Sequence, residues 1–228
     1  MPIPPALPEV NFFLAMEIME PHRLDELVAE LEVKTKQFPN DVRRIVLLGT
    51  AHFLRGRQVA SIAAFRRALA SNPNLPYAHY YMGVALYLNA QTAEAITSLR
   101  TAIALYPYWS MAHYWLGVAY YHKGAYAEAR ECFETVLRDS PEMHSAAYQA
   151  ALTCLATSDF ARARDHLERL SRETDRADPQ VQLLLGRAYF GLQMMTEAMV
   201  VYREGLAKHP DDPALAAALS ELEDVQEP

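Results

Sequence analysis

The chain has 228 residues, of which 51% are hydrophobic and 21% charged, a composition typical of a folded globular protein rather than a disordered one. Its 28 acidic and 21 basic residues give a formal net charge of −7. This balance argues against nucleic acid as a partner, which would require a basic surface. The two cysteines provide no disulfide framework, so we expect a reducing, cytoplasmic location. The apolar run at 12–16 is too short to span a membrane, and no direct membrane insertion is expected.

Four kinds of residue recur along the chain at an interval of 34 residues. Prolines stand at Pro39, Pro73, Pro107 and Pro141. Three further series keep the same phase, each with an interval of 35 before its last member. They are a small series of Gly49, Gly83, Gly117, Ala151 and Gly186, a second small series of Ser61, Ala95, Ala129, Ala163 and Ala198, and a large apolar series of Phe65, Leu99, Phe133, Leu167 and Tyr202. Series that share one phase predict an internal repeat.

Each interval predicts a pair of helices joined by a turn. Apolar residues recur within it at helical spacing, as at Ala95, Leu99 and Ala102, and each small residue lets a neighbouring helix approach closely. Gly56 and Gly124 fall between the two helices, where a left-handed turn is expected. Proline ends the second helix because it cannot continue the hydrogen-bond ladder. Such a pair cannot bury its own apolar face and must stack on its neighbours.

This pattern resembles the tetratricopeptide repeat family, whose 34-residue helix pairs carry small residues at positions 8 and 20 and proline at position 32. The resemblance implies an all-α fold, a right-handed α-solenoid of about six helix pairs with a C-terminal capping helix. The first pair is degenerate, because Leu27 stands at position 20. The expected parts are a flexible leader at 1–7, the degenerate pair at 8–41, five repeats at 42–75, 76–109, 110–143, 144–178 and 179–212, and a capping helix and tail at 213–228.

The expected capping helix has its own start signal and an amphipathic pattern. Asp212 is a good N-cap residue and Pro213 a good first helical residue. Leu215, Leu219 and Leu222 form one apolar stripe on a helix that is otherwise largely small or polar. A polar outer face lets a solenoid end without aggregating.

In the family that the pattern resembles, the first helix of each pair lines a concave groove through positions 2, 5, 9, 12 and 13. Here positions 9 and 13, where the family often places Asn and Lys, are mostly apolar, as at Val84 and Leu88. The Lys, Asn and Arg clamp that chaperone-tail adaptors of the family use for a terminal carboxylate is therefore missing. The residues expected to form the partner-binding groove are Phe53, Tyr77, Tyr80, Val84, Tyr87, Leu88, Met111, Tyr114, Val118, Tyr121, His122, Tyr148, Leu152, Arg187 and Phe190.

An aromatic, apolar groove with a polar rim favours a protein partner. We expect a non-enzymatic interaction module that holds a helix or an extended segment of another protein, as an assembly factor, a chaperone or a subunit of a larger complex. The alternative is a self-associating scaffold, a homo-oligomer in which another copy occupies the groove or the solenoid ends. The chain's own leader, with Phe12 and Phe13 close behind it, is another candidate to cover the groove.

Histidine and cysteine are the side chains most able to supply chemistry here. His79 and His113 both stand at position 4 of successive repeats, which is consistent with a metal pair or with helix packing through a hydrogen bond. Third and fourth ligands are not apparent, so no metal site is expected. Cys132 and Cys154 are interpreted as small buried hydrophobic residues. No catalytic residue and no cofactor are predicted.

Overall fold

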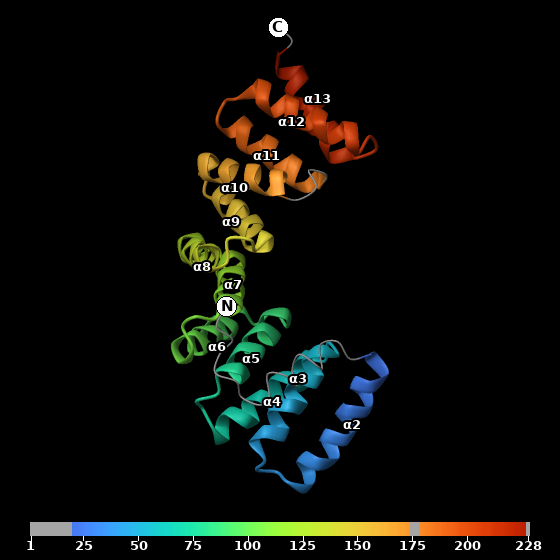
Figure 1. Cartoon of the computed structure of the whole chain (residues 1–228), viewed down its shortest axis with the longest axis vertical. Coiled ribbons are helices and arrows are strands. Elements are labelled where there is room, and N and C mark those ends of the chain that lie inside the picture. Colours follow the sequence, from blue (N-terminus) through green and yellow to red (C-terminus); the bar gives the residue numbers. More distant parts are fainter. Residues whose placement is uncertain (1–19, 174–177, 227–228) are drawn as a thin grey trace. The chain divides into compact units, whose positions relative to one another are not determined.

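The computed structural model describes residues 20–173 and 178–226 (Figure 1). Over these residues every regular element is an α-helix, which confirms the expected all-α class. The helices are α2 (Pro21–Gln37), α3 (Val42–Leu54), α4 (Gln58–Ser71), α5 (Pro76–Leu88), α6 (Thr92–Leu105), α7 (Ser110–His122), α8 (Tyr126–Asp139), α9 (His144–Ala156), α10 (Phe160–Glu173), α11 (Pro179–Gly191), α12 (Met195–Lys208) and α13 (Pro213–Gln226). The expected leader at 1–7 and the start of the degenerate pair lie outside the described residues.

Each of the five expected repeats contains two helices, beginning with α3 and α4 in 42–75 and ending with α11 and α12 in 179–212. The chain also divides into two compact units, an N-terminal unit at 1–123 and a C-terminal unit at 124–228. Within each unit consecutive helices pack against one another, which is the arrangement of an α-solenoid. In the N-terminal unit α5 also contacts both α3 and α7, so the first helices of successive repeats are neighbours.

The small and large residues of the repeat pack directly against each other. A Cβ atom placed on Gly83 would lie 2.6 Å from Cγ of Leu99, and one on Gly186 would lie 2.0 Å from Cε1 of Tyr202. Gly49 meets the ring of Phe65 in the same way, at 2.9 Å. The large partner is buried in every case. The sequence interval between small and large residue therefore corresponds to a contact between the two helices of one pair.

The second small series supports the same close approach. Ser61 is fully buried and its hydroxyl donates a hydrogen bond to the backbone carbonyl of Gly49, at 2.9 Å. Ala95, Ala163 and Ala198 occupy the equivalent position and are also fully buried. A larger side chain at these points would separate the helices of the pair.

The turn within each helix pair contains one residue in the left-handed region. Gly56 and Gly124 have φ values of 69° and 77°, as the sequence predicts. The equivalent residues of the other turns are Ala90, Ser158 and Gln193, with φ between 57° and 63°. The turn geometry therefore repeats even where glycine is absent.

The capping helix α13 closes the C-terminal unit. Asp212 accepts hydrogen bonds from the backbone N–H groups of Ala214 and Leu215 at 3.0 and 2.9 Å, which is the expected N-cap. Leu215 and Leu222 are buried in one cluster with Tyr202, and Leu219 packs against it. Exposed small and acidic residues such as Ala217 and Glu221 form its outer face.

At the other end, α2 packs on α3 through Leu24, Val28 and Leu31. Both oxygens of Asp25 on α2 accept hydrogen bonds from Arg55, at 2.9 and 2.8 Å. His52 lies beneath this helix, with its ring buried and its Nδ1 atom without a hydrogen-bond partner in the described structure.

The close contact at Gly83 gives the first prediction. Gly83→Leu should lower the free energy of unfolding by about 2 kcal/mol or more, because the new side chain would overlap both Leu99 and its backbone nitrogen. Denaturant unfolding of the variant measures this loss. Ala93→Leu, on the exposed face of α6, is the matched control and should change stability by no more than about 0.5 kcal/mol. Equal stabilities of the two variants would show that Gly83 is not a packing site.

A second prediction concerns the pH dependence of stability. Burial lowers the pKa of His52, an effect that Glu32 opposes from 3.8 Å and Arg57 reinforces. Because the pKa is lower in the folded state, the unfolded state binds the proton first as pH falls, and stability is lost below about pH 6.5. His52→Gln should therefore show a smaller drop in melting temperature between about pH 7.5 and about pH 5.5 than the wild type. Ala93→Gln, on the exposed face of α6, changes no titratable group and should retain the wild-type pH dependence. Identical slopes for His52→Gln and the wild type would contradict the assignment.

Candidate functional site

The groove residues predicted in the N-terminal unit lie mainly on α5 and α7, which contact each other. The α5 set is Tyr77, Tyr80, Val84, Tyr87 and Leu88, and the α7 set is Met111, Tyr114, Val118, Tyr121 and His122. The spacing within each set places its members on one side of the helix. Aromatic contacts join the two helices at both ends of this surface, which we call the α5–α7 face.

The first group of contacts, the Trp109 cluster, lies where α7 begins. Trp109 is the N-cap residue of α7. Its ring centroid is 4.8 Å from that of Tyr77 and 4.4 Å from that of Tyr80, and Tyr106 lies 6.4 Å away. Aromatic pairs at these distances stabilise a fold by about 0.5–1.5 kcal/mol beyond the area they bury. The cluster fixes the N-terminal ends of α5 and α7 relative to each other.

The second group, the Tyr87 cluster, lies at the C-terminal ends of the same helices. The Tyr87 ring centroid is 5.8 Å from that of Trp115 and 5.6 Å from that of His122. Tyr121 contacts the same histidine at 5.5 Å. Burial raises the pKa of the Tyr87 phenol, so the hydroxyl is neutral at physiological pH. It can donate or accept a hydrogen bond without carrying charge.

Exposure separates the residues of this face into two groups. Tyr80, Val84 and Val118 are 9%, 2% and 5% exposed, so they support the face from beneath and offer almost no surface. Leu88 and Met111 are 50% and 39% exposed. The accessible surface is formed by these two, the exposed His122 and the half-buried residues Tyr77, Tyr87, Tyr114 and Tyr121.

Phe53 extends the aromatic surface onto α3. Its side chain is half-buried, and its ring centroid is 5.3 Å from that of Tyr81 on α5. It also packs against the core cluster around Leu86, as Tyr87 does. Phe53 therefore helps to hold α3 beside α5.

The remaining predicted residues belong to the C-terminal unit. On α9, Tyr148 and Leu152 are half-buried against the core of that unit. The Tyr148 hydroxyl donates a hydrogen bond to the side-chain carbonyl of Gln180, at 3.2 Å. On α11, Arg187 is exposed and Phe190 is 48% exposed. Phe190 is thus an accessible apolar side chain, whereas Tyr148 joins α9 to the start of α11.

Two periodic histidines have a structural role. Nε2 of His79 donates to the carbonyl of Pro73 at 2.9 Å, and Nε2 of His113 donates to the carbonyl of Pro107 at the same distance. Each bond joins position 4 of one repeat to the proline that ends the preceding one. Of the two interpretations left open by the sequence, the hydrogen bond is the one observed. Among the described residues, no group of histidine, cysteine and acidic side chains could hold a metal ion.

Both cysteines are buried, as their interpretation requires. Burial raises the pKa of the Cys132 thiol to about 12 and that of the Cys154 thiol to about 11. Thiols with such values carry almost no thiolate at neutral pH and are poor nucleophiles.

Both tryptophans contribute to the α5–α7 face, and neither was predicted from the sequence. Trp109 and Trp115 fall outside the groove positions carried over from the family, yet each contacts a tyrosine of this face. The sequence could have pointed to these residues, because the chain has only two tryptophans and both lie within seven residues of each other.

Profiles of the tetratricopeptide repeat match residues 80–144, 126–180 and 155–222, and a TPR repeat profile matches residues 49–89. These matches cover most of the chain. The chain belongs to the tetratricopeptide repeat family. No curated protein matches it significantly in sequence. None of the described helices of this repeat protein is long and apolar enough to cross a membrane.

Several solved structures share its fold. PilW, described as a widely conserved type IV pilus biogenesis factor, aligns with a TM-score of 0.73 at 20% identity, over 94% of this chain and all of PilW. YrrB, described as a TPR protein with an unusual peptide-binding site, has a TM-score of 0.75 at 13% identity, over 82% of this chain and 96% of its own. MamA from Desulfovibrio magneticus RS-1 has a TM-score of 0.67 at 18% identity, over 82% and 97%. Identities this low establish a common fold only.

Proposed function

We propose that the protein is a non-enzymatic interaction module that binds a helix or an extended segment of a partner protein on its α5–α7 face. The observation that carries this proposal is that the partly accessible tyrosines of α5 and α7 share one face with the exposed apolar side chains of Leu88 and Met111. Leu88 and Met111 are 50% and 39% exposed and share this face with four partly accessible tyrosines. An exposed surface that groups apolar and aromatic side chains in this way is typical of an interaction site. Family membership supports the broader role, because these repeats form protein–protein interaction modules.

The chemistry of the face suits a protein partner. Tyrosine combines a large apolar ring with a neutral hydroxyl and is enriched among residues that dominate binding energy. Tyr77 and Tyr87 are each held by a ring contact, so little side-chain entropy would be lost on binding. In this proposal the partner's apolar residues contact Leu88 and Met111, and the tyrosine hydroxyls supply hydrogen bonds. The protein acts as an assembly factor, a chaperone or a peripheral subunit of a larger complex.

The third prediction tests this site. Tyr87→Ala combined with Tyr121→Ala should weaken binding of the natural partner by about 2–4 kcal/mol, as truncation of aromatic residues that dominate binding energy does. Affinity capture with quantitative mass spectrometry, comparing wild type and variant, identifies the partner, and titration calorimetry then measures the loss. Tyr108→Ala is the matched control, because this side chain is 75% exposed and makes none of the described ring contacts between α5 and α7. This control should bind the partner with unchanged affinity.

Other outcomes would assign the face differently. If a second copy occupies it, the double variant should abolish concentration-dependent association in sedimentation velocity and leave the capture profile unchanged. If the chain's own N-terminal residues cover it, deleting residues 1–10, which lie outside the described structure, should increase binding of an apolar dye. A double variant with unchanged partner affinity, association state and stability would refute a binding role for this face.

A further inference from the structure

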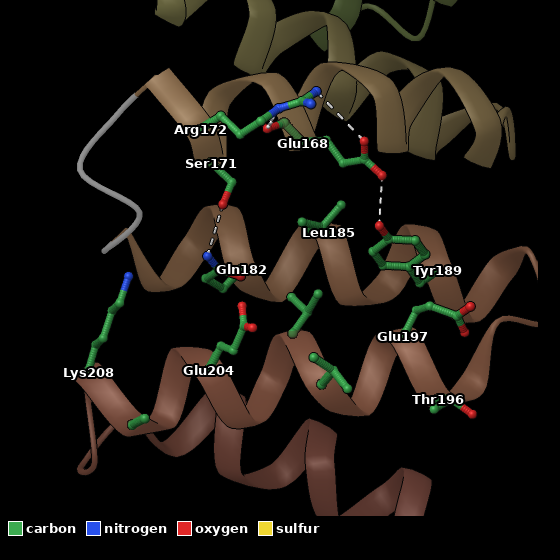
Figure 2. Close-up of a pocket in the computed structure, with 13 residues that line it drawn as sticks. Glu168, Ser171, Arg172, Gln182, Leu185, Tyr189, Thr196, Glu197, Glu204 and Lys208 are labelled. Atoms are coloured by element: carbon green, nitrogen blue, oxygen red, sulfur yellow. Dashed lines mark hydrogen bonds and ion pairs between the residues drawn. The ribbon is translucent and has the colours of Figure 1, made fainter.

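A pocket lies within the C-terminal unit, lined by α10, α11 and α12 (Figure 2). Its volume is about 780 Å³, within the usual range of about 300–1,000 Å³ for ligand sites. Leu185 and Tyr189 line it from α11. The predicted groove residues of α11, Arg187 and Phe190, do not line it, and each is rotated away from Leu185 and Tyr189 by about 100° or more around the helix. The pocket is therefore separate from the site proposed above.

The α12 wall of the pocket has a regular pattern of charge and apolar surface. Glu197, Val200, Val201 and Glu204 all line the pocket, at spacings that place them on one face of the helix. The carboxylates stand two turns apart, roughly 10.5 Å along the axis. Between them Val200 is 47% exposed, and Leu185 of α11 faces the same space. Along this wall, a carboxylate is therefore followed by an aliphatic surface and then by a second carboxylate.

The α10 wall is different because its charges are already paired. Glu168 accepts a hydrogen bond from the Tyr189 hydroxyl at 2.7 Å, and Arg172 lies 3.8 Å from its other oxygen. Burial, together with the hydrogen bond to Glu168, raises the pKa of Tyr189 to about 12. Ser171 accepts a hydrogen bond from the side-chain amide of Gln182 at 3.2 Å. Figure 2 shows the Ser171–Gln182 and Glu168–Tyr189 bonds crossing from α10 to α11.

The two carboxylates of α12 have no such compensation. Within the described residues, neither Glu197 nor Glu204 makes a hydrogen bond or an ion pair, and both side chains are exposed. Lys208 lines one end of the pocket, a turn beyond Glu204 (Figure 2). With Lys208 at one end, the open part of the pocket has a carboxylate on each side of an aliphatic patch and an excess of negative charge. Its complement carries two positive charges separated by apolar surface.

We propose that this pocket binds a basic amphipathic helix of a partner protein. The helix presents two Lys or Arg residues two turns apart to Glu197 and Glu204, with aliphatic residues between them against Val200 and Leu185. Such a pattern, Lys-x-x-Leu-Leu-x-x-Lys, reads the same in both chain directions, so the match does not depend on the orientation of the bound helix. Charge complementarity selects this occupant, since an acidic helix would be repelled from the same wall.

A designed peptide tests the proposal without knowledge of the natural partner. The probe is a fluorescent, helix-stabilised peptide with one Lys-Ala-Gln-Leu-Leu-Gln-Ala-Lys motif, and binding to the full chain is followed by fluorescence anisotropy. The peptide should bind, and raising the salt concentration should weaken it. Glu197→Gln combined with Glu204→Gln should raise the dissociation constant about fivefold or more, since two partly exposed ion pairs are lost. The same peptide with Glu in place of both Lys residues should not bind.

Two control variants show whether the peptide binds at this pocket or elsewhere on the acidic surface. Glu221→Gln with Asp224→Asn removes the same net charge from the exposed face of α13 and should leave the dissociation constant unchanged. Tyr87→Ala with Tyr121→Ala should also leave it unchanged, so failure of this proposal is distinguishable from failure of the proposed function. Absence of binding, equal affinity for the wild type and the Glu197/Glu204 variant, or an equal loss in the α13 control would each overturn the proposal.

Discussion

In three of the helix pairs, a glycine of the first helix lies directly against a large buried side chain of the second: Gly49 against Phe65, Gly83 against Leu99, and Gly186 against Tyr202. The glycine leaves the space that the large side chain fills, so the size of each residue limits the size of the other. This contact sets the distance between the two helices of a pair. Because the two residues of the contact are 16 positions apart in each of these pairs, the pairs have similar geometry and can stack in a regular manner.

The candidate binding surfaces depend on this regularity. Stacking makes α5 and α7 neighbours, so position 12 of one first helix meets position 13 of the next, as Tyr87 and His122 do. On the other side of a first helix, the second helices of two repeats form the walls of a pocket, as α10 and α12 do around α11. One repeat geometry thus generates two kinds of surface. Their chemistry differs because one carries neutral aromatic rings and the other unpaired carboxylates.

Much of the fold follows from the sequence, because its constraints are local or periodic. The small and large series predict the helix pairs, and Gly56 and Gly124 predict two of the left-handed turns. The turns at Ala90 and Gln193 were not predicted, because there the surrounding helices impose a conformation that the residue itself disfavours.

The candidate site was less predictable, since burial depends on neighbours that the repeat pattern does not specify. Tyr80 has the sequence position of a groove residue, yet Trp109 and Tyr81 cover it. The pocket in the C-terminal unit could not be predicted either, because three helices form its walls. Its charge also depends on which side chains form ion pairs or hydrogen bonds in the folded chain. Glu168 finds Tyr189 and Arg172, whereas Glu197 and Glu204 find none among the described residues.

The most direct test of the central contact is a double-mutant cycle at Gly186 and Tyr202, because a Cβ atom placed on this glycine would lie only 2.0 Å from the tyrosine ring. Gly186→Ala in the wild-type background should destabilise the fold by about 1–3 kcal/mol, because the added methyl group overlaps the tyrosine ring. In a Tyr202→Leu background the ring is gone, and the same substitution should cost much less. Denaturant unfolding of the four proteins should therefore give a coupling energy of about 1 kcal/mol or more. Additive effects of the two substitutions would contradict the account, because they would mean that the small and large residues of the repeat do not define each other's space.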